Sequence, residues 1–356
     1  MTNHLSSVWL LLLSTLVATS GDRWGNDTSA RRLDREQLLV YRDRHGEVQP
    51  VKTVRAWAKR RAEIVRGMES VMGPLPGRAS RCALDPVIEQ ETDCGRYGRR
   101  LITYASEPRS RTPAWLLIPK EALSGKQKFL AVLCPHPTGP VEDPNYAREL
   151  AARGYVTLTP NYPLLGKYEP DLKALGWESG TMKAIWDNIR GLDLLDSLPY
   201  VKHGKYGAIG HSLGGHNSVY TAVFDQRVRV VVSSCGFDSY LDYYGGDPQN
   251  WQLERGWCQT RYMPKLAEYQ GRLAEIPFDF HEMVGALAPR PVFINAPLGD
   301  SNFKWESVDR VVLAASQVYR LYGKPENLRV EHPDCGHDFP AAMRQAAYRL
   351  LDQSLR

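Results

Sequence analysis

The glycine-rich segment at residues 210–215 has the clearest chemical meaning in the sequence. It reads Gly-His-Ser-Leu-Gly-Gly and lies between the β-type run YGAIG (206–210) and a helical run. A strand–turn–helix turn of this kind holds the serine hydroxyl above the sheet, and the helix N-terminus directs backbone N–H groups at a developing oxyanion. We therefore predict that Ser212 is a nucleophile and that the Leu213 N–H helps to form its oxyanion hole.

A serine hydroxyl needs a neighbouring base, and the chain order expected for this turn is serine, then acid, then histidine. His337 lies in a loop between the last β-type run and the final helical run, directly after a glycine. His332 is its rival, but it belongs to the strand end, and Pro333 restricts it to extended backbone. His337 is the predicted base.

Two aspartates compete for the role of the acid that orients this histidine. Asp300 follows the β-type run PVFINAP (291–297), and Asp238 follows the run RVRVVVSS (227–234). Both strand ends could reach the histidine, and the chain order favours Asp300. Asp338 is adjacent to His337, so its side chain should point away and cap the last helix.

The loop at residues 134–140 is expected to complete the oxyanion hole, which needs a second N–H from the loop after an earlier strand. Pro137 has no N–H, so Thr138 or His136 must donate, and we assign Thr138. The side chains expected to contact the substrate are His136, Tyr162, Tyr243 and Trp251.

Other kinds of chemistry find little support in the sequence. There is no HExxH, no clustered Cys/His spacing, no GxGxxG and no P-loop, so we expect neither a metal nor a cofactor. The 356 residues are 43% hydrophobic and 24% charged, as in a folded globular protein. With 45 basic and 40 acidic residues and no basic run, nucleic acid is not an expected partner.

The elements that must position these residues alternate between β-type runs and helical patterns. Many of the runs are continuously apolar, which indicates strands buried on both faces. The alternation predicts an α/β fold with a mostly parallel, doubly wound sheet flanked by helices. Residues 236–289 interrupt it and are rich in aromatic side chains. Because they leave the carboxyl end of a strand, where ligands bind in such sheets, we predict a lid.

The N-terminal part of the sequence indicates export, and the chain after it divides into three segments. Residues 5–18 are apolar and uncharged and precede Ala18-Thr19-Ser20, so residues 1–20 are predicted to be a signal peptide of a secreted or periplasmic protein. A membrane anchor is the alternative, but the stretch is short for a span. We expect a flexible leader at 21–50, a helical and hairpin extension at 51–94 and the catalytic domain at 95–356. Cys82 and Cys94 could bridge this extension or remain free thiols.

The chain resembles the α/β-hydrolase superfamily, and within it the dienelactone hydrolase-like and acetyl xylan esterase-like secreted hydrolases. The resemblance covers about residues 95–356 and rests on the segments LCPHPTG, PNYPLLG, IGHSLGGH, VVSSCGFDS, APRPVFINAPLGDSNF and HPDCGHDFP. It implies a serine esterase without a cofactor, with Ser212, Asp300 and His337 at the triad positions. Dienelactone hydrolases use a cysteine nucleophile, and the serine found here indicates ordinary ester cleavage.

These observations predict a secreted serine carboxylic ester hydrolase that acts through an acyl-enzyme, on an acetylated carbohydrate or another small ester. The alternative is a serine peptidase of the prolyl-oligopeptidase type, which shares the triad. Such enzymes carry a large N-terminal propeller, and no propeller-like repeat precedes the hydrolase core here. A non-catalytic binding protein is the third reading, and it would predict the loss of a triad member. The sequence does not indicate an oligomeric state.

Overall fold

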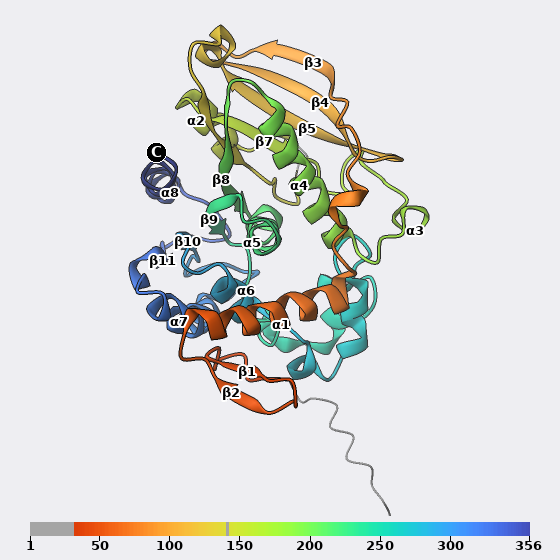
Figure 1. The fold of residues 1–356 in the computed structure, drawn as a ribbon, viewed down its shortest axis with the longest axis vertical. Coiled ribbons are helices and arrows are strands. Elements are labelled where there is room, and N and C mark those ends of the chain that lie inside the picture. The colour runs from red at the N-terminus through yellow and green to blue at the C-terminus, as the bar shows by residue number, and fades with distance from the viewer. Residues whose placement is uncertain (1–31, 140–141) are drawn as a thin grey trace, which may run out of the picture. The chain divides into compact units, whose positions relative to one another are not determined.

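The computed structural model describes residues 32–139 and 142–356. Within them nine strands form one sheet in the order β11-β10-β9-β8-β6-β7-β5-β4-β3, and β1 pairs with β2 separately (Figure 1). The strands are β1 (Val40–Arg42), β2 (Val48–Pro50), β3 (Val87–Asp93), β4 (Tyr97–Glu107), β5 (Ser110–Pro119), β6 (Phe129–Leu133), β7 (Val156–Pro160), β8 (Val201–His211), β9 (Val228–Ser234), β10 (Val292–Asn295) and β11 (Leu328–Glu331). The predicted signal peptide, residues 1–20, lies outside the described residues, as do residues 21–31.

Parallel pairing runs through the part of the sheet that carries the predicted site. β6 pairs in parallel with β7 and β8, and β8, β9, β10 and β11 continue the parallel order. β3, β4 and β5 form an antiparallel meander that joins the sheet through β7. The predicted mostly parallel α/β sheet is confirmed. The carboxyl ends of β8, β9 and β10 lie side by side, and the candidate residues follow these ends in the sequence.

Helices cover both faces of this sheet. They are α1 (Val54–Met72), α2 (Asn145–Ala152), α3 (Leu172–Leu175), α4 (Gly180–Ser197), α5 (Leu213–Phe224), α6 (Phe280–Ala286), α7 (Trp305–Leu321) and α8 (Ala341–Leu355). On β6, Ala131 and Leu133 join the core cluster with α4 and α5, and Val132 joins the cluster with α2 and α8. This alternation explains why the strand is apolar throughout.

The structure differs from the expected flexible leader in the described part of residues 21–50. β1 and β2 form a hairpin there, and Arg32 and Arg35 form ion pairs with Glu282 and Asp279. The next element, α1, buries Trp57 and other apolar side chains in the main core. The leader is polar in sequence because its arginines neutralise buried carboxylates, a partnership between residues about 250 positions apart. β3 precedes the expected boundary at residue 95 and pairs with β4 beyond it.

Cys82 and Cys94 are free in the structure. The Cys82 thiol contacts the carbonyl of Ala105, and Cys94 lies at the turn beside Tyr97, at the other end of β4. These two positions on β4 are eight residues apart, which corresponds to roughly 26 Å along a strand. A disulfide needs Cα atoms within about 7 Å, so the pairing considered from the sequence is excluded by this geometry.

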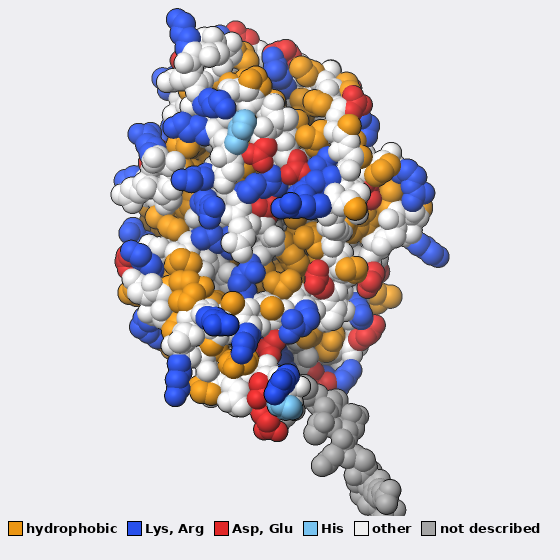
Figure 2. All heavy atoms as spheres, viewed as in Figure 1, with side chains coloured by type: hydrophobic (Ala, Val, Ile, Leu, Met, Phe, Trp, Pro, Cys, Tyr) orange, Lys and Arg blue, Asp and Glu red, His pale blue; other side chains and the backbone are white. Residues whose placement is uncertain are grey.

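The surface shows no single dominant charge on the face seen in Figure 2. Lys and Arg side chains are spread there among acidic, apolar and uncharged areas. In the ranges that the structure describes, none of the helices has the length and apolar character that crossing a bilayer requires.

A buried ion cluster ties α4 to the antiparallel part of the sheet. The Lys183 side chain is inaccessible to solvent and its Nζ lies 2.5 Å from Asp187 and 3.0 Å from Glu107. Burial acts against the charged ammonium, but Asp187, Tyr168 and Glu107 outweigh it and raise the pKa of Lys183 above its usual value. The cluster is therefore charged, and each member depends on the others.

We expect Lys183→Ala to lower the free energy of unfolding by about 3–5 kcal/mol, because it leaves two carboxylates without their buried cation. Urea denaturation measures this change. Lys202→Ala, at an exposed position on β8, is the matched control and should change stability by no more than about 0.5 kcal/mol. A loss as small as that of the control would contradict a charged, mutually dependent cluster.

Candidate active site

The turn around Ser212 has the geometry that the glycine pattern predicts. β8 ends at His211 and α5 begins at Leu213, so Ser212 alone connects strand and helix. Its φ of 53° and ψ of −121° lie in a region that non-glycine residues occupy only at a cost in free energy. A Cβ on Gly210 would overlap the backbone of Gly214. The close approach of strand and helix therefore requires glycine, and it leaves Ser212 at the carboxyl end of the sheet.

The loop after β6 packs against the first turn of α5. A Cβ on Gly214 would overlap the Pro135 carbonyl, so the two segments touch backbone to backbone. Thr138 lines the same cavity as Ser212 and Leu213. Among the described residues, no acceptor is found for the backbone N–H of Thr138 or of Leu213. Both N–H groups are thus available to a ligand beside the Ser212 hydroxyl.

Asp300 and His337 form a close pair at the ends of neighbouring strands. His337 Nδ1 lies 2.9 Å and 3.0 Å from the two carboxylate oxygens of Asp300. The carboxylate also accepts hydrogen bonds from the N–H groups of Asn302 and Phe303. Burial raises the pKa of Asp300, but these hydrogen bonds outweigh burial and lower it below its usual value. The ionised carboxylate therefore holds the proton of His337 on Nδ1, which leaves Nε2 as the basic nitrogen.

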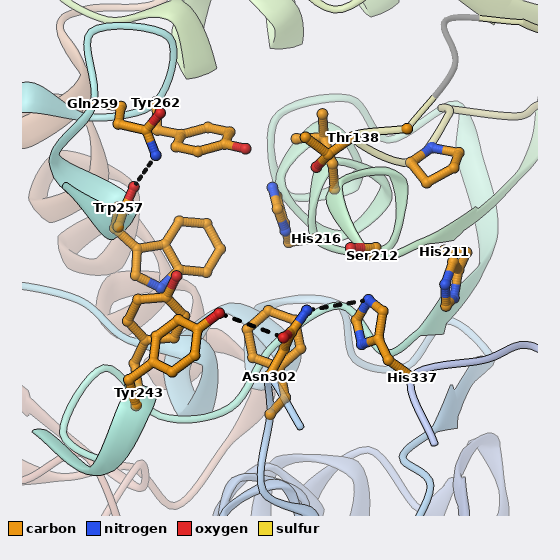
Figure 3. A pocket seen from close by; sticks show the side chains of 16 residues that line it. Thr138, His211, Ser212, His216, Tyr243, Trp257, Gln259, Tyr262, Asn302 and His337 are labelled. Atoms are coloured by element: carbon orange, nitrogen blue, oxygen red, sulfur yellow. Dashed lines mark hydrogen bonds between the residues drawn. The ribbon is translucent and has the colours of Figure 1, made fainter. Parts of the chain in front are cut away.

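The predicted nucleophile and base line one cavity of about 420 Å³ (Figure 3). Its wall contains Ser212 and His337, together with Leu213 and Thr138. His337 Nε2 lies 3.5 Å from the side-chain nitrogen of Asn302, and there is no hydrogen bond between His337 and Ser212. Longer contacts of this kind are common before substrate binds.

The rivals considered from the sequence lie elsewhere. His332 contacts Asp309 and the Ala296 carbonyl, away from the cavity wall. Asp238 is buried; one of its oxygens accepts from Lys304 N, and the other has no partner among the described residues. Burial raises the pKa of Asp238 to about 8, so the group is mostly protonated at neutral pH. A neutral carboxyl with no contact to His337 is unsuited to orient it.

Of the four side chains expected to contact substrate, only that of Tyr243 lies in the cavity wall. Trp251 is fully buried and packs edge-on against Tyr240 and Tyr243, because its apolar ring contributes more to the core. His136 and Tyr162 are also buried and bond to each other behind the wall. The expectation of substrate contact is therefore wrong for Trp251, His136 and Tyr162.

The sequence reasoning missed several residues of the wall. Segment 236–289 contributes Tyr244, Gly256, Trp257, Gln259 and Tyr262 besides Tyr243, and the loop after β10 contributes Asn302 and Phe303. The aromatic richness of that segment was visible in the sequence, but only Trp257 of its two tryptophans lines the cavity, and both pack against Tyr240 and Tyr243. Asn302 and Phe303 could have been found, because they lie two and three residues after Asp300 in the same loop.

The cavity wall carries no net charge. None of the residues that line it within the described ranges is Asp, Glu, Lys or Arg. Burial lowers the pKa of His211 to about 4 and that of His216 to about 3, so both rings are neutral at pH 7. His211 packs against the His337 ring, with centroids 4.9 Å apart. A substrate therefore meets a neutral, largely aromatic surface around Ser212.

One group of possible metal ligands overlaps this site. The ligand atoms of Cys235, Asp300 and His337 lie within 4.8 Å of one another. Burial, reinforced by the nearby Asp300, raises the pKa of the Cys235 thiol well above its usual value. Metals bind the thiolate, and His337 already uses Nδ1 for Asp300, so these donors suit the observed hydrogen bonds better than a metal ion.

The proteins that match this chain in sequence include hydrolases and carbohydrate esterases. A family model described as "Glucuronyl esterase, fungi" matches residues 176–323. "Putative hydrolase YtaP" of Bacillus subtilis is 28% identical over 223 residues, which are 60% of this chain and 70% of that protein. A 4-O-methyl-glucuronoyl methylesterase of Phanerochaete carnosa is 22% identical over 188 residues. The matched residues are 48% of this chain and 45% of that enzyme. This chain therefore spans under half of that enzyme's length.

Solved structures show the same fold. A glucuronoyl esterase from Solibacter usitatus superimposes with a TM-score of 0.69 at 18% identity, over 93% of this chain and 100% of that one. A family 15 glucuronoyl esterase from Caldicellulosiruptor kristjansonii gives 0.66 at 18% identity, over 86% and 88%. The chain therefore has the α/β-hydrolase fold that these esterases share. It carries serine, acid and histidine in the order expected from its sequence.

We expect Asp238→Asn to change the pH dependence of stability. Since the native pKa is about 8 and that of an unfolded aspartate is about 4, the native state holds a proton that the unfolded chain has lost between these values. The free energy of unfolding contributed by this group therefore falls as the pH rises from about 4 to about 8. Asparagine cannot ionise, so the variant should lack this decline. Urea denaturation from pH 5 to pH 9 measures it, and identical pH slopes would contradict the assignment.

Proposed function

We propose that this α/β-hydrolase cleaves carboxylic esters of a neutral carbohydrate or of another small alcohol through an acyl-enzyme. The observation that carries the proposal is the shared cavity, in which Ser212 stands on a strained turn and His337 is held by Asp300. Serine, oriented base and available N–H groups are the parts that acyl transfer needs.

In the proposed reaction the Ser212 hydroxyl attacks the ester carbonyl and passes its proton to His337 Nε2. Asp300 keeps the other ring proton on Nδ1 and stabilises the imidazolium that forms. The tetrahedral intermediate then expels the alcohol, which takes the proton from His337. Water, activated by the same Nε2, attacks the acyl-enzyme, and the carboxylic acid leaves as Ser212 regains its proton.

The oxyanion of each intermediate would accept hydrogen bonds from the N–H groups of Leu213 and Thr138. Both residues lie in the cavity wall, and the N-terminal end of α5 adds its positive dipole. Loss of one such donor typically lowers kcat by about 10²–10³-fold.

The wall favours a neutral, hydroxylated substrate. It contains no charged side chain among the described residues, and its rings from Tyr243, Trp257 and Tyr262 offer flat apolar faces. The side chains of Gln259 and Asn302 lie in the same wall, and their amide groups offer donors and acceptors to the hydroxyl groups of a sugar. The names of the matching enzymes describe carbohydrate esters in which the sugar supplies the acyl group, and they support a carbohydrate ester as the broader substrate class.

We also propose that the protein is exported, on the basis of the apolar segment and small-residue site in residues 1–20. A carbohydrate ester outside the cell would then be accessible to the enzyme. No other partner is required for the proposed reaction.

The test compares the protein and its Ser212→Ala variant on p-nitrophenyl acetate and on aminoacyl-arylamides. We expect ester turnover in the wild type, a loss of at least about 10⁴-fold in kcat for the variant, and no amide cleavage. Ester turnover that survives in the variant would contradict a Ser212 nucleophile. Comparable cleavage of the arylamides would favour a prolyl-oligopeptidase-like peptidase instead.

A further inference from the structure

His136 is buried behind the cavity wall, and both of its ring nitrogens are engaged. Nε2 lies 2.9 Å from the backbone nitrogen of Tyr162, and Nδ1 lies 2.7 Å from the carbonyl oxygen of Pro137. A backbone N–H can only donate, so Nε2 must accept the hydrogen bond from Tyr162. The ring proton is therefore on Nδ1, which donates to the Pro137 carbonyl. Two fixed partners thus determine the tautomer of His136.

This contact determines the direction of the next peptide group. The bond between Pro137 and Thr138 is trans, and in a trans peptide the C=O and N–H point in opposite directions. Because the Pro137 carbonyl points back at the buried imidazole, the Thr138 N–H points away from it. Thr138 lies in the cavity wall, and its N–H has no acceptor within the described ranges.

Contacts on two sides also fix the backbone of the loop just before His136. Tyr146 donates its hydroxyl hydrogen to the Pro135 carbonyl, and the backbone of Gly214 touches that carbonyl from the other side. Tyr162 is itself fixed, because its hydroxyl bonds to Thr181. With both ends of the imidazole anchored, the peptide between Pro137 and Thr138 has little freedom to rotate.

We propose that His136 is a positioning residue that turns the Thr138 N–H toward the oxyanion. It does so by donating its Nδ1 proton to the Pro137 carbonyl while Nε2 is held by the Tyr162 N–H. Because this N–H matters only when Ser212 attacks an ester, the role of His136 rests on the proposed function. Burial lowers the pKa of His136, which agrees with a ring that stays neutral.

Two conservative variants separate the two contacts of the ring. Asparagine places an N–H donor where Nδ1 lies and can keep the bond to Pro137, whereas glutamine places an oxygen near Nε2 and can keep only the bond to Tyr162. We expect His136→Gln to lower kcat by about 10–100-fold with KM changed less than about threefold, and His136→Asn to stay within about fivefold of the wild type. Tyr206→Phe, in the middle of β8, removes the hydroxyl that bonds to Asp196 and is a control for general destabilisation.

The affinity for a transition-state analogue distinguishes a positioning role from a purely structural role, because only a positioning role would change it. A trifluoromethyl ketone forms an adduct with a nucleophilic serine that carries the oxyanion, so its affinity should fall in His136→Gln by the same factor as kcat and recover in His136→Asn. Wild-type inhibitor affinity in His136→Gln, or equal losses in both variants, would overturn the proposal. Ester activity that persists in Ser212→Ala would instead refute the proposed function.

The wild-type protein supplies a test that needs no variant. With ¹⁵N-labelled histidine, the NMR signals of His136 should report a neutral ring protonated at Nδ1 between pH 6 and pH 8. A ring protonated at Nε2, or an imidazolium in this range, would overturn the proposal even if the variants fail to fold.

Discussion

The backbone contact between the turn at Ser212 and the loop after β6 is the constraint on which the rest of the site depends. Gly210 and Gly214 have no room for a Cβ, because strand, helix and loop meet there with only backbone between them. The close packing holds Ser212 at a positive φ and keeps its hydroxyl at the end of the sheet. It also brings the loop that carries Thr138 close to the first N–H groups of α5. A larger residue at Gly214 would force apart the turn that carries Ser212 and the loop that carries Thr138, the proposed oxyanion donor.

The negative charge of Asp300 is the main electrostatic influence on the His337 ring. Within the described structure, Asp300 is the ionised group that contacts His337, and His211 and His216 are neutral because burial lowers the pKa of each ring. Asp238, which could have added a second negative charge nearby, is kept protonated by its burial. The basicity of His337 Nε2 is thereby set by one partner, and the neutral wall is left to select the substrate through shape and hydrogen bonds.

The sequence predicted the fold and the pairing of His337 with Asp300, because both depend on local patterns. The glycines around Ser212 and the strand ends before Asp300 and His337 are readable without any long-range contact. The wall of the cavity was not predictable in the same way. Trp251 and Trp257 are six residues apart in one irregular segment and both are buried in the core, yet only Trp257 also lines the cavity. Only the packing of that segment on α5 and α6 separates them.

Long-range partners account for the remaining differences. His136 follows a strand near the nucleophile, as a substrate-binding residue would, but the backbone of Tyr162 engages its free nitrogen. The polar leader folds because Arg32 and Arg35 meet carboxylates near residue 280. In both cases the residue type was informative about chemistry, and the partner that decides its role lies far away in the sequence.

The central claim is that Ser212 is activated by a histidine that Asp300 orients, and a covalent labelling rate tests it most directly. A fluorophosphonate should modify a single peptide, the one that contains Ser212. The labelling rate should fall by about 10³–10⁴-fold in Asp300→Asn and stay near that of the wild type in Asp238→Asn. Labelling of another residue, or an unchanged rate in Asp300→Asn, would contradict the account.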